Sequence, residues 1–265
     1  MNGSDVKDKA LQGGNFQHES SFLKNMPSLR RTLTLLSLFS IAMGFLEAVV
    51  VIYLREIYYP DGFRFPLVPI PSRMALIEIL REAATLIMLV TIGLLAGKTP
   101  ARRFSYFLFC FAVWDLFYYV FLKLFLGWPE SLFTFDILFL IPVPWTGPVL
   151  APCLASLTMI LLALVLVYCE NKNSKVQILR SEWLLLAAGA TVILASFVQD
   201  YMLYVFRNNR AVWVAGNSRE LFDDFLNYIP LTFNWMLFLS GEALLLAAIA
   251  GILRRLNKEL RMRDS

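Results

Sequence analysis

Histidine is nearly absent from this chain, and cysteine and charged residues are scarce. The one histidine, His18, lies in a polar N-terminal stretch, which argues against a bis-histidine haem and a histidine-rich metal site. A hydrolase triad that needs histidine is excluded on the same ground. The three cysteines are not closely paired and lie in or beside apolar runs, so we expect no disulfide. We therefore expect no haem and assign no metal ligands. The sequence leaves any other cofactor unspecified, and a divalent metal held by carboxylates alone stays open as a variant of an enzyme hypothesis.

Apolar residues are abundant instead. Of 265 residues, 58% are hydrophobic and only 17% are charged, and the mean hydropathy is +0.62. Soluble domains are roughly half apolar and a quarter charged, so this composition indicates a membrane protein. A crossing needs about 20 mostly apolar residues. Six windows reach that length: 33–55, 74–97, 105–126, 147–169, 183–205 and 230–253.

These windows predict an all-α integral membrane protein, a bundle of about six transmembrane helices. Residues 29–256 form the transmembrane domain, because the joining segments are too short for a separate soluble domain. Residues 1–28 are polar and lack the apolar run of a secretory signal, so we predict a disordered cytoplasmic tail. Residues 257–265 are expected to form a basic cytoplasmic tail.

The distribution of Lys and Arg predicts the orientation in the membrane, because positive residues near helix ends stay in the cytoplasm. The N- and C-terminal tails have five each, and segments 98–104 and 170–182 have three each. The segments on the opposite side have only six in total. We therefore expect both termini on the cytoplasmic side of the plasma (inner) membrane. The net charge of +4 follows from this topology, so the bilayer is the expected partner and no nucleic acid is needed.

Ionisable residues within the predicted spans are the most informative feature. They are Glu47, Glu78, Arg81, Glu82, Asp115, Asp200 and Glu242. Exposing all of them to lipid would cost on the order of 20 kcal/mol. By position in their spans, all seven lie at mid-depth or on the outer side, so we predict one polar pocket that opens outward.

Helical spacing supports a shared pocket, because residues three and four apart lie on one helix face. Glu78, Arg81 and Glu82 form one stripe, Asp115 and Tyr119 belong to a second, and Asp200 to a third. Polar residues of this kind also occur as hydrogen-bonded contacts that only hold a bundle together.

Between the third and fourth spans, residues 129–148 contain an apolar run that is too short to cross and is closed by prolines. This predicts a re-entrant or interfacial hairpin whose Asp136 forms part of the pocket wall. An interfacial helix is the alternative. In the last outer segment, residues 218–226 have the pattern of a short surface helix with one apolar face.

The candidate ligand- or ion-binding residues are therefore Glu47, Glu78, Arg81, Glu82, Asp115, Tyr119, Asp136, Asp200 and Glu242. No catalytic residue is assigned. The excess of acids favours the binding or transport of a proton, a cation or a small cationic solute. An intramembrane enzyme that modifies a lipid or isoprenoid by carboxylate acid/base catalysis is the alternative. A third hypothesis is an accessory subunit that docks a membrane-protein partner or a second copy of itself.

Overall fold

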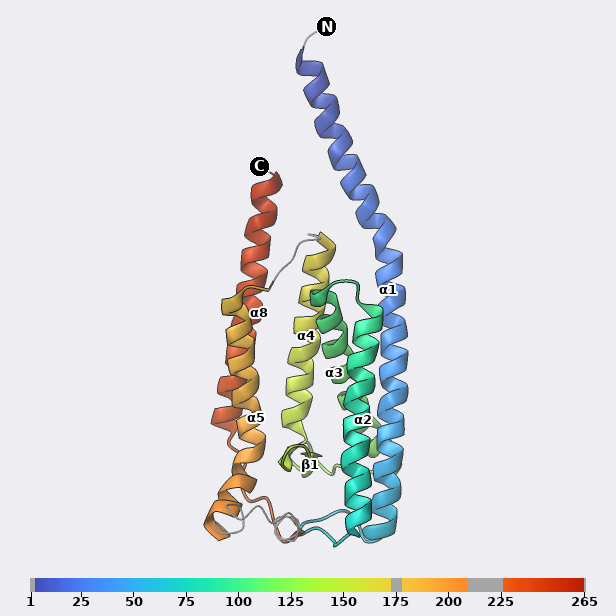
Figure 1. Cartoon of the computed structure of the whole chain (residues 1–265), viewed down its shortest axis with the longest axis vertical. Helices are drawn as coiled ribbons and strands as arrows, with labels where there is room; N and C mark the ends of the chain where they lie inside the picture. The colour runs from blue at the N-terminus through green and yellow to red at the C-terminus, as the bar shows by residue number, and fades with distance from the viewer. Residues whose placement is uncertain (1–2, 173–177, 209–225, 265) are drawn as a thin grey trace.

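The structure is a computed structural model that describes residues 3–172, 178–208 and 226–264. Six long helices dominate this part of the chain, with one short antiparallel β-hairpin (Figure 1). The helices are α1 (Gly3–Tyr58), α2 (Ser72–Ala96), α3 (Pro100–Leu126), α4 (Leu150–Lys172), α5 (Arg180–Asn208) and α8 (Trp235–Asp264). The strands are β1 (Phe135–Phe139) and β2 (Trp145–Pro148).

All six of these helices are long and apolar enough to cross a membrane. Their apolar segments are Leu29–Tyr58, Ser72–Ala96, Pro100–Leu126, Leu150–Lys172, Arg180–Arg207 and Trp235–Glu259. The predicted helical architecture with six such segments is therefore confirmed, and it supports a multi-pass membrane protein.

Several helix starts differ from the predicted spans: α3 begins five residues earlier, at Pro100, whereas α4 and α8 begin later. Gly147 and Pro148 belong to β2, so α4 begins later than expected. Residues 230–234 precede α8, because the Asn234 side chain accepts a hydrogen bond from the Leu237 N–H (3.0 Å) and so caps the helix there. Helix α1 extends back to Gly3 and α8 forward to Asp264, where the sequence predicted tails. The division into 1–28, 29–256 and 257–265 stays a prediction.

The segment between α3 and α4 does form a hairpin, and its pairing is that of two β-strands. Asp136 pairs with Gly147, and Ile137 with Thr146. Pro142 and Pro144 lie in the connection, where their missing N–H groups interrupt no strand pairing. The interfacial helix considered for this segment is therefore wrong, and the depth of the hairpin relative to a bilayer stays a prediction. The surface helix predicted at 218–226 lies almost entirely outside the described residues.

The helices pack through α3, which contacts α1, α2 and α4, whereas α5 packs on α8 and α8 on α4. Both chain ends lie at one end of the bundle, and the hairpin lies at the other (Figure 1). Glycine permits the closest helix approaches. A Cβ at Gly44 would lie 2.8 Å from the Trp114 carbonyl oxygen on α3, and one at Gly241 would lie 2.9 Å from the Gly189 carbonyl oxygen on α5. Small residues at such crossings are typical of membrane helix packing.

Candidate functional site

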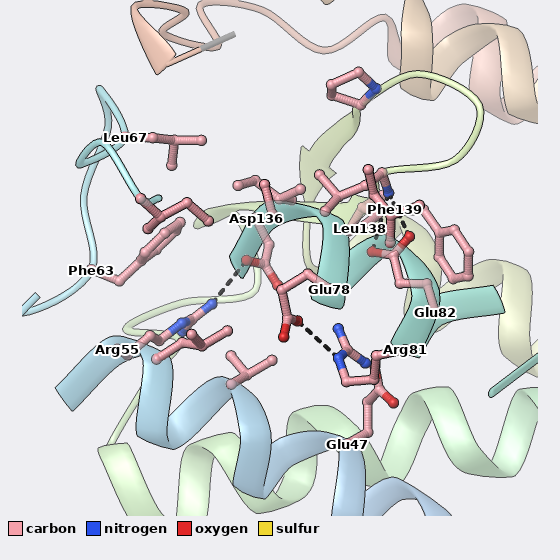
Figure 2. Close-up of a pocket in the computed structure, with 18 of the residues that line it drawn as sticks. Glu47, Arg55, Phe63, Leu67, Glu78, Arg81, Glu82, Asp136, Leu138 and Phe139 are labelled. Carbon is pink, nitrogen blue, oxygen red and sulfur yellow. Dashed lines mark hydrogen bonds and ion pairs between the residues drawn. The ribbon is translucent and has the colours of Figure 1, made fainter. Parts of the chain in front are cut away.

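A cavity of about 530 Å³ lies at the hairpin end of the bundle. Its walls come from α1, α2 and α3, from the 59–71 segment and from the hairpin, with Tyr201 of α5 and Leu226 at its margin. Figure 2 shows charged side chains from three of these walls around one space. Ligand pockets in proteins span roughly 300–1,000 Å³, so the size suits a small molecule.

Seven of the nine candidate residues line this cavity: Glu47, Glu78, Arg81, Glu82, Asp115, Tyr119 and Asp136. The other two, Asp200 and Glu242, do not belong to its lining. The structure thus brings together the acids of the first three spans and the hairpin, and it separates them from those of α5 and α8.

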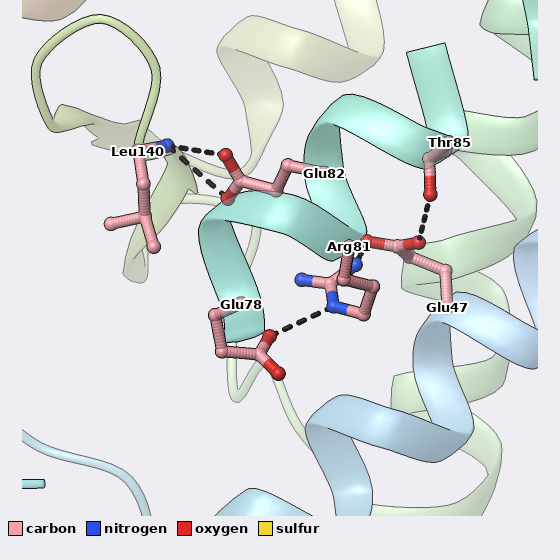
Figure 3. Close-up of polar contacts among 6 residues, drawn as sticks. All are labelled: Glu47, Glu78, Arg81, Glu82, Thr85 and Leu140. Carbon is pink, nitrogen blue, oxygen red and sulfur yellow. Dashed lines mark hydrogen bonds and ion pairs between the residues drawn. The ribbon is translucent and has the colours of Figure 1, made fainter. Parts of the chain in front are cut away.

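Arg81 is the centre of a polar network that joins α1 to α2 (Figure 3). Its Nε donates to Glu78 Oε2 at 2.8 Å, and its Nη1 forms an ion pair with Glu47. The second Glu47 oxygen accepts a hydrogen bond from the Thr85 hydroxyl at 3.1 Å. One turn of α2 separates Glu78 from Arg81, so the ion pair within the stripe follows from helical spacing. The contact between Arg81 and Glu47, by contrast, depends on the packing of α2 against α1.

Glu82 lies on the same face of α2 and contacts the hairpin instead. Both of its carboxylate oxygens accept from the Leu140 N–H, at 3.0 and 3.2 Å (Figure 3). Leu140 directly follows β1, so this contact fixes the end of the strand against α2. No ion pair with Glu82 is present within the described residues.

Asp115 occupies the α3 wall of the cavity. Its carboxylate accepts a hydrogen bond from the Ser156 hydroxyl of α4 at 2.8 Å. The aromatic rings of Tyr118 and Tyr119 lie one turn further along α3, with their centroids 4.9 Å apart, and both line the cavity. In the part of the chain that the structure describes, Asp115 has no cationic partner within ion-pair distance.

Arg55 and Asp136 form the most deeply buried ion pair of the site. Arg55 Nη2 donates to Asp136 Oδ1 at 2.9 Å, and the two residues are 7% and 1% exposed. The Arg55 guanidinium carbon also lies 3.7 Å from the ring centroid of Trp128 and 4.3 Å from that of Phe63. Such cation–π contacts are strongest where water is excluded. The pair therefore attaches the hairpin to the end of α1.

Arg55 was not predicted to be a site residue. It lies at the edge of an apolar run, where loop charges are common, and was therefore assigned to the positive residues on the outer side. The sequence contained one indication of this pair. Asp136 is a lone acid within an apolar segment, and a buried carboxylate needs a cation nearby. Sequence spacing does not identify that cation, because 81 residues separate the two.

Burial shifts the pKa values of two ionisable groups at this end of the molecule, Tyr59 and Asp136. It raises the pKa of the Asp136 carboxyl, and the adjacent Arg55 guanidinium opposes that rise. Burial also raises the pKa of the Tyr59 hydroxyl, which accepts a hydrogen bond from the Val68 N–H at 2.9 Å.

Three buried polar atoms on lining residues have no hydrogen-bond partner among the described residues. They are Arg55 Nη1, Trp114 Nε1 and Asp136 Oδ2. An unpaired buried polar group costs free energy, so such atoms need a structural explanation. A ligand or water bound in the adjacent cavity would give these atoms hydrogen-bond partners.

The charges of the lining do not balance. Five carboxyl groups and two guanidinium groups line the cavity. Arg81 is shared by Glu47 and Glu78, and Arg55 is paired with Asp136. Glu82 and Asp115 are left with hydrogen bonds from neutral donors. The arrangement can attract a cation, or it can hold protons on its carboxyl groups.

Asp200 and Glu242 have local partners elsewhere. The Asp200 carboxylate accepts from the Tyr228 hydroxyl at 2.7 Å and from the Thr232 hydroxyl at 3.2 Å, beside a separate cavity of about 220 Å³. Glu242 accepts a 2.6 Å hydrogen bond from the Thr158 hydroxyl between α4 and α8. Successive residues on a helix point about 100° apart, which explains why Tyr201 reaches the main cavity and its neighbour Asp200 does not.

The described residues contain no group of three or more His, Cys, Asp or Glu side chains arranged to hold a metal ion. Cys110, Cys153 and Cys169 are present as free thiols. No family model, curated protein or solved structure is significantly similar to the chain.

Proposed function

We propose that this chain is a multi-pass plasma-membrane protein that binds or transports a proton, a cation or a small cationic solute. The excess of five carboxyl groups over two guanidinium groups in one cavity carries this proposal. Uncompensated carboxylates are unfavourable in a medium of low dielectric constant, and either bound protons or a bound cation relieve that cost.

The cavity lies at the end of the bundle opposite both chain ends (Figure 1). The excess of Lys and Arg on the side of the termini supports a cytoplasmic location for both ends, because positive residues are retained there. With this orientation the cavity faces away from the cytoplasm and takes up its ligand from the outer side.

Reconstitution into liposomes tests the proposal. Purified protein is reconstituted with a pH-sensitive dye inside, and proton flux is recorded while Na⁺, K⁺ or a small organic amine is added outside. We expect a flux that depends on pH or on the added cation and that falls by about tenfold or more in Glu82→Gln. Glutamine still offers an oxygen to the Leu140 N–H, so this variant removes the charge and preserves the contact.

Glu130→Gln is the matched control, because Glu130 is an exposed carboxylate at the same end of the molecule and outside the cavity lining. It should transport like the wild type. Wild-type protein without any pH- or cation-dependent flux or binding, and indistinguishable from Glu82→Gln, would refute the proposal.

A second candidate is an intramembrane enzyme that acts on a lipid or isoprenoid. The observation in its favour is the position of Trp114, Tyr118 and Tyr119 beside Asp115, because aromatic faces stabilise positive charge and a carboxylic acid can donate a proton. Lipid and pigment extracts of a deletion strain test this alternative, and extracts identical to those of the parent strain would count against it. Co-purification in mild detergent tests the accessory-subunit hypothesis.

A further inference from the structure

Two of the carboxylates that line the cavity form no ion pair with either of its two arginines. Arg81 contacts Glu47 and Glu78, and Arg55 contacts Asp136. Glu82 on α2 and Asp115 on α3 contact the Leu140 N–H and the Ser156 hydroxyl. A positive group that enters the cavity therefore has two carboxylates available without displacing an arginine.

The cavity wall also contains polar atoms that need a partner. Trp114 is 5% exposed and Asp136 is 1% exposed, and both residues line the cavity. Trp114 Nε1 and Asp136 Oδ2 have no hydrogen-bond partner within the described ranges. Asp136 Oδ2 is an acceptor, so an N–H donor of a ligand satisfies it, whereas the Trp114 N–H is a donor that needs an acceptor such as a water oxygen.

Most of the remaining wall is apolar or aromatic. Aliphatic and aromatic side chains from α1, α2, the 59–71 segment and the hairpin form it: Val51, Leu54, Phe63, Leu67, Ile79 and Val143. A hydrated inorganic cation gains nothing from such a surface, whereas the hydrocarbon part of an organic ligand is favoured by leaving water there. The rings of Trp114, Tyr118 and Tyr119 add faces that attract an ammonium group.

We infer that the cavity binds a protonated amine with a bulky apolar substituent, its ammonium group between Glu82 and Asp115 and its hydrocarbon part against the apolar wall. The inference rests on the proposed cation site and names its ligand class. The cavity volume of about 530 Å³ holds more than a bare ion or a single proton needs, and it falls within the range of small-molecule sites.

A matched series of probes tests charge and hydrocarbon separately. The probes are 4-phenylbutylamine, the neutral 4-phenylbutan-1-ol and the anionic 4-phenylbutyrate, titrated calorimetrically into the full chain in lipid nanodiscs, with empty nanodiscs subtracted. We expect the amine to bind about tenfold or more tightly than the alcohol, and we expect no binding of the carboxylate.

Variants then assign the site. Asp115→Asn and Glu82→Gln each remove one charge and keep an oxygen for the observed hydrogen bond, so each should weaken amine binding by about tenfold or more. Glu130→Gln should bind the amine like the wild type. The thermal midpoint of each variant is measured alongside, and the comparison of amine with alcohol on the wild type stands even if a variant does not fold.

Equal binding of amine and alcohol would overturn the inference, and so would amine binding that neither variant weakens.

The liposome experiment separates the two proposals. If the amine does not bind while Glu82-dependent flux of protons or inorganic cations persists, the ligand class is wrong and the cation site stands. If neither the amine binds nor any flux or cation binding is found, both proposals fail.

Discussion

Arg55 illustrates how single residues determine this site. Its guanidinium group lies between two aromatic rings and contacts a carboxylate that is 1% exposed. Breaking a buried ion pair by removing one partner costs about 3–5 kcal/mol, because the other charge is left uncompensated. The Arg55–Asp136 contact is therefore the point at which one substitution has the largest expected effect on the hairpin.

We predict that Arg55→Met lowers the free energy of unfolding by about 3–5 kcal/mol. Adding Asp136→Asn to this variant should recover part of the loss, because the uncompensated charge is then removed. Unfolding in detergent, followed by tryptophan fluorescence, measures both effects. Arg64→Met is the control, since Arg64 is exposed in the nearby 59–71 segment. Equal stability of Arg55→Met and Arg64→Met would contradict the assignment.

The stability of Arg55→Met should also depend on pH in a distinct way. Burial raises the pKa of Asp136 above its ordinary value of 3.8, so the folded protein holds this proton more tightly than the unfolded chain. Stability is then greatest below that value and falls as pH rises through the folded pKa. Without Arg55 the pKa of Asp136 rises further, so the deficit of Arg55→Met against the wild type should be larger at pH 7 than at pH 4. A deficit that is the same at both values would exclude this linkage.

At the scale of secondary-structure elements, the spans were predictable and the hairpin only in part. Runs of about 20 apolar residues are a strong signal, which explains why every predicted window largely overlaps an observed helix. The pairing of Phe135–Phe139 with Trp145–Pro148 was not predicted, since a short apolar run fits a strand or a helix equally well. The prolines marked the connection correctly.

Helix packing at this scale depends on glycine, and Gly241 offers a direct test. A Cβ there would lie 2.7 Å from Ile193 Cγ1 and 2.9 Å from the Gly189 carbonyl oxygen. Gly241→Ala should therefore lower stability by about 1–3 kcal/mol, as overpacking does. Gly251→Ala on the same helix meets no atom within 4 Å and should leave stability unchanged or slightly raise it. Thermal unfolding of the two variants compares them, and equal midpoints would show that α5 and α8 do not approach this closely.

At the scale of the whole molecule, the arrangement of helices decides which acids share a cavity. The sequence predicted the depth of each acid from its place in a span and the face of the helix that it shares with its polar neighbours, and on these two grounds all of them were placed together. It does not specify the direction in which a side chain points, or which helices are neighbours. Because α5 and α8 pack mainly on each other, and α5 reaches the cavity through Tyr201 and not through its neighbour, Asp200 and Glu242 lie outside the cavity that the acids of α1, α2 and α3 line.

Carboxyl groups from three helices and the hairpin line one cavity, and we propose that this cavity accepts a cation. A density map of the full chain in nanodiscs, recorded with and without 4-(4-bromophenyl)butylamine, tests it most directly. We predict an open cavity in both maps and, with the amine, additional density between Glu82 and Asp115 that extends along the apolar wall. A map in which α1, α2 and α3 close together, with each carboxyl group bonded to a local neighbour and no space between them, would contradict the account.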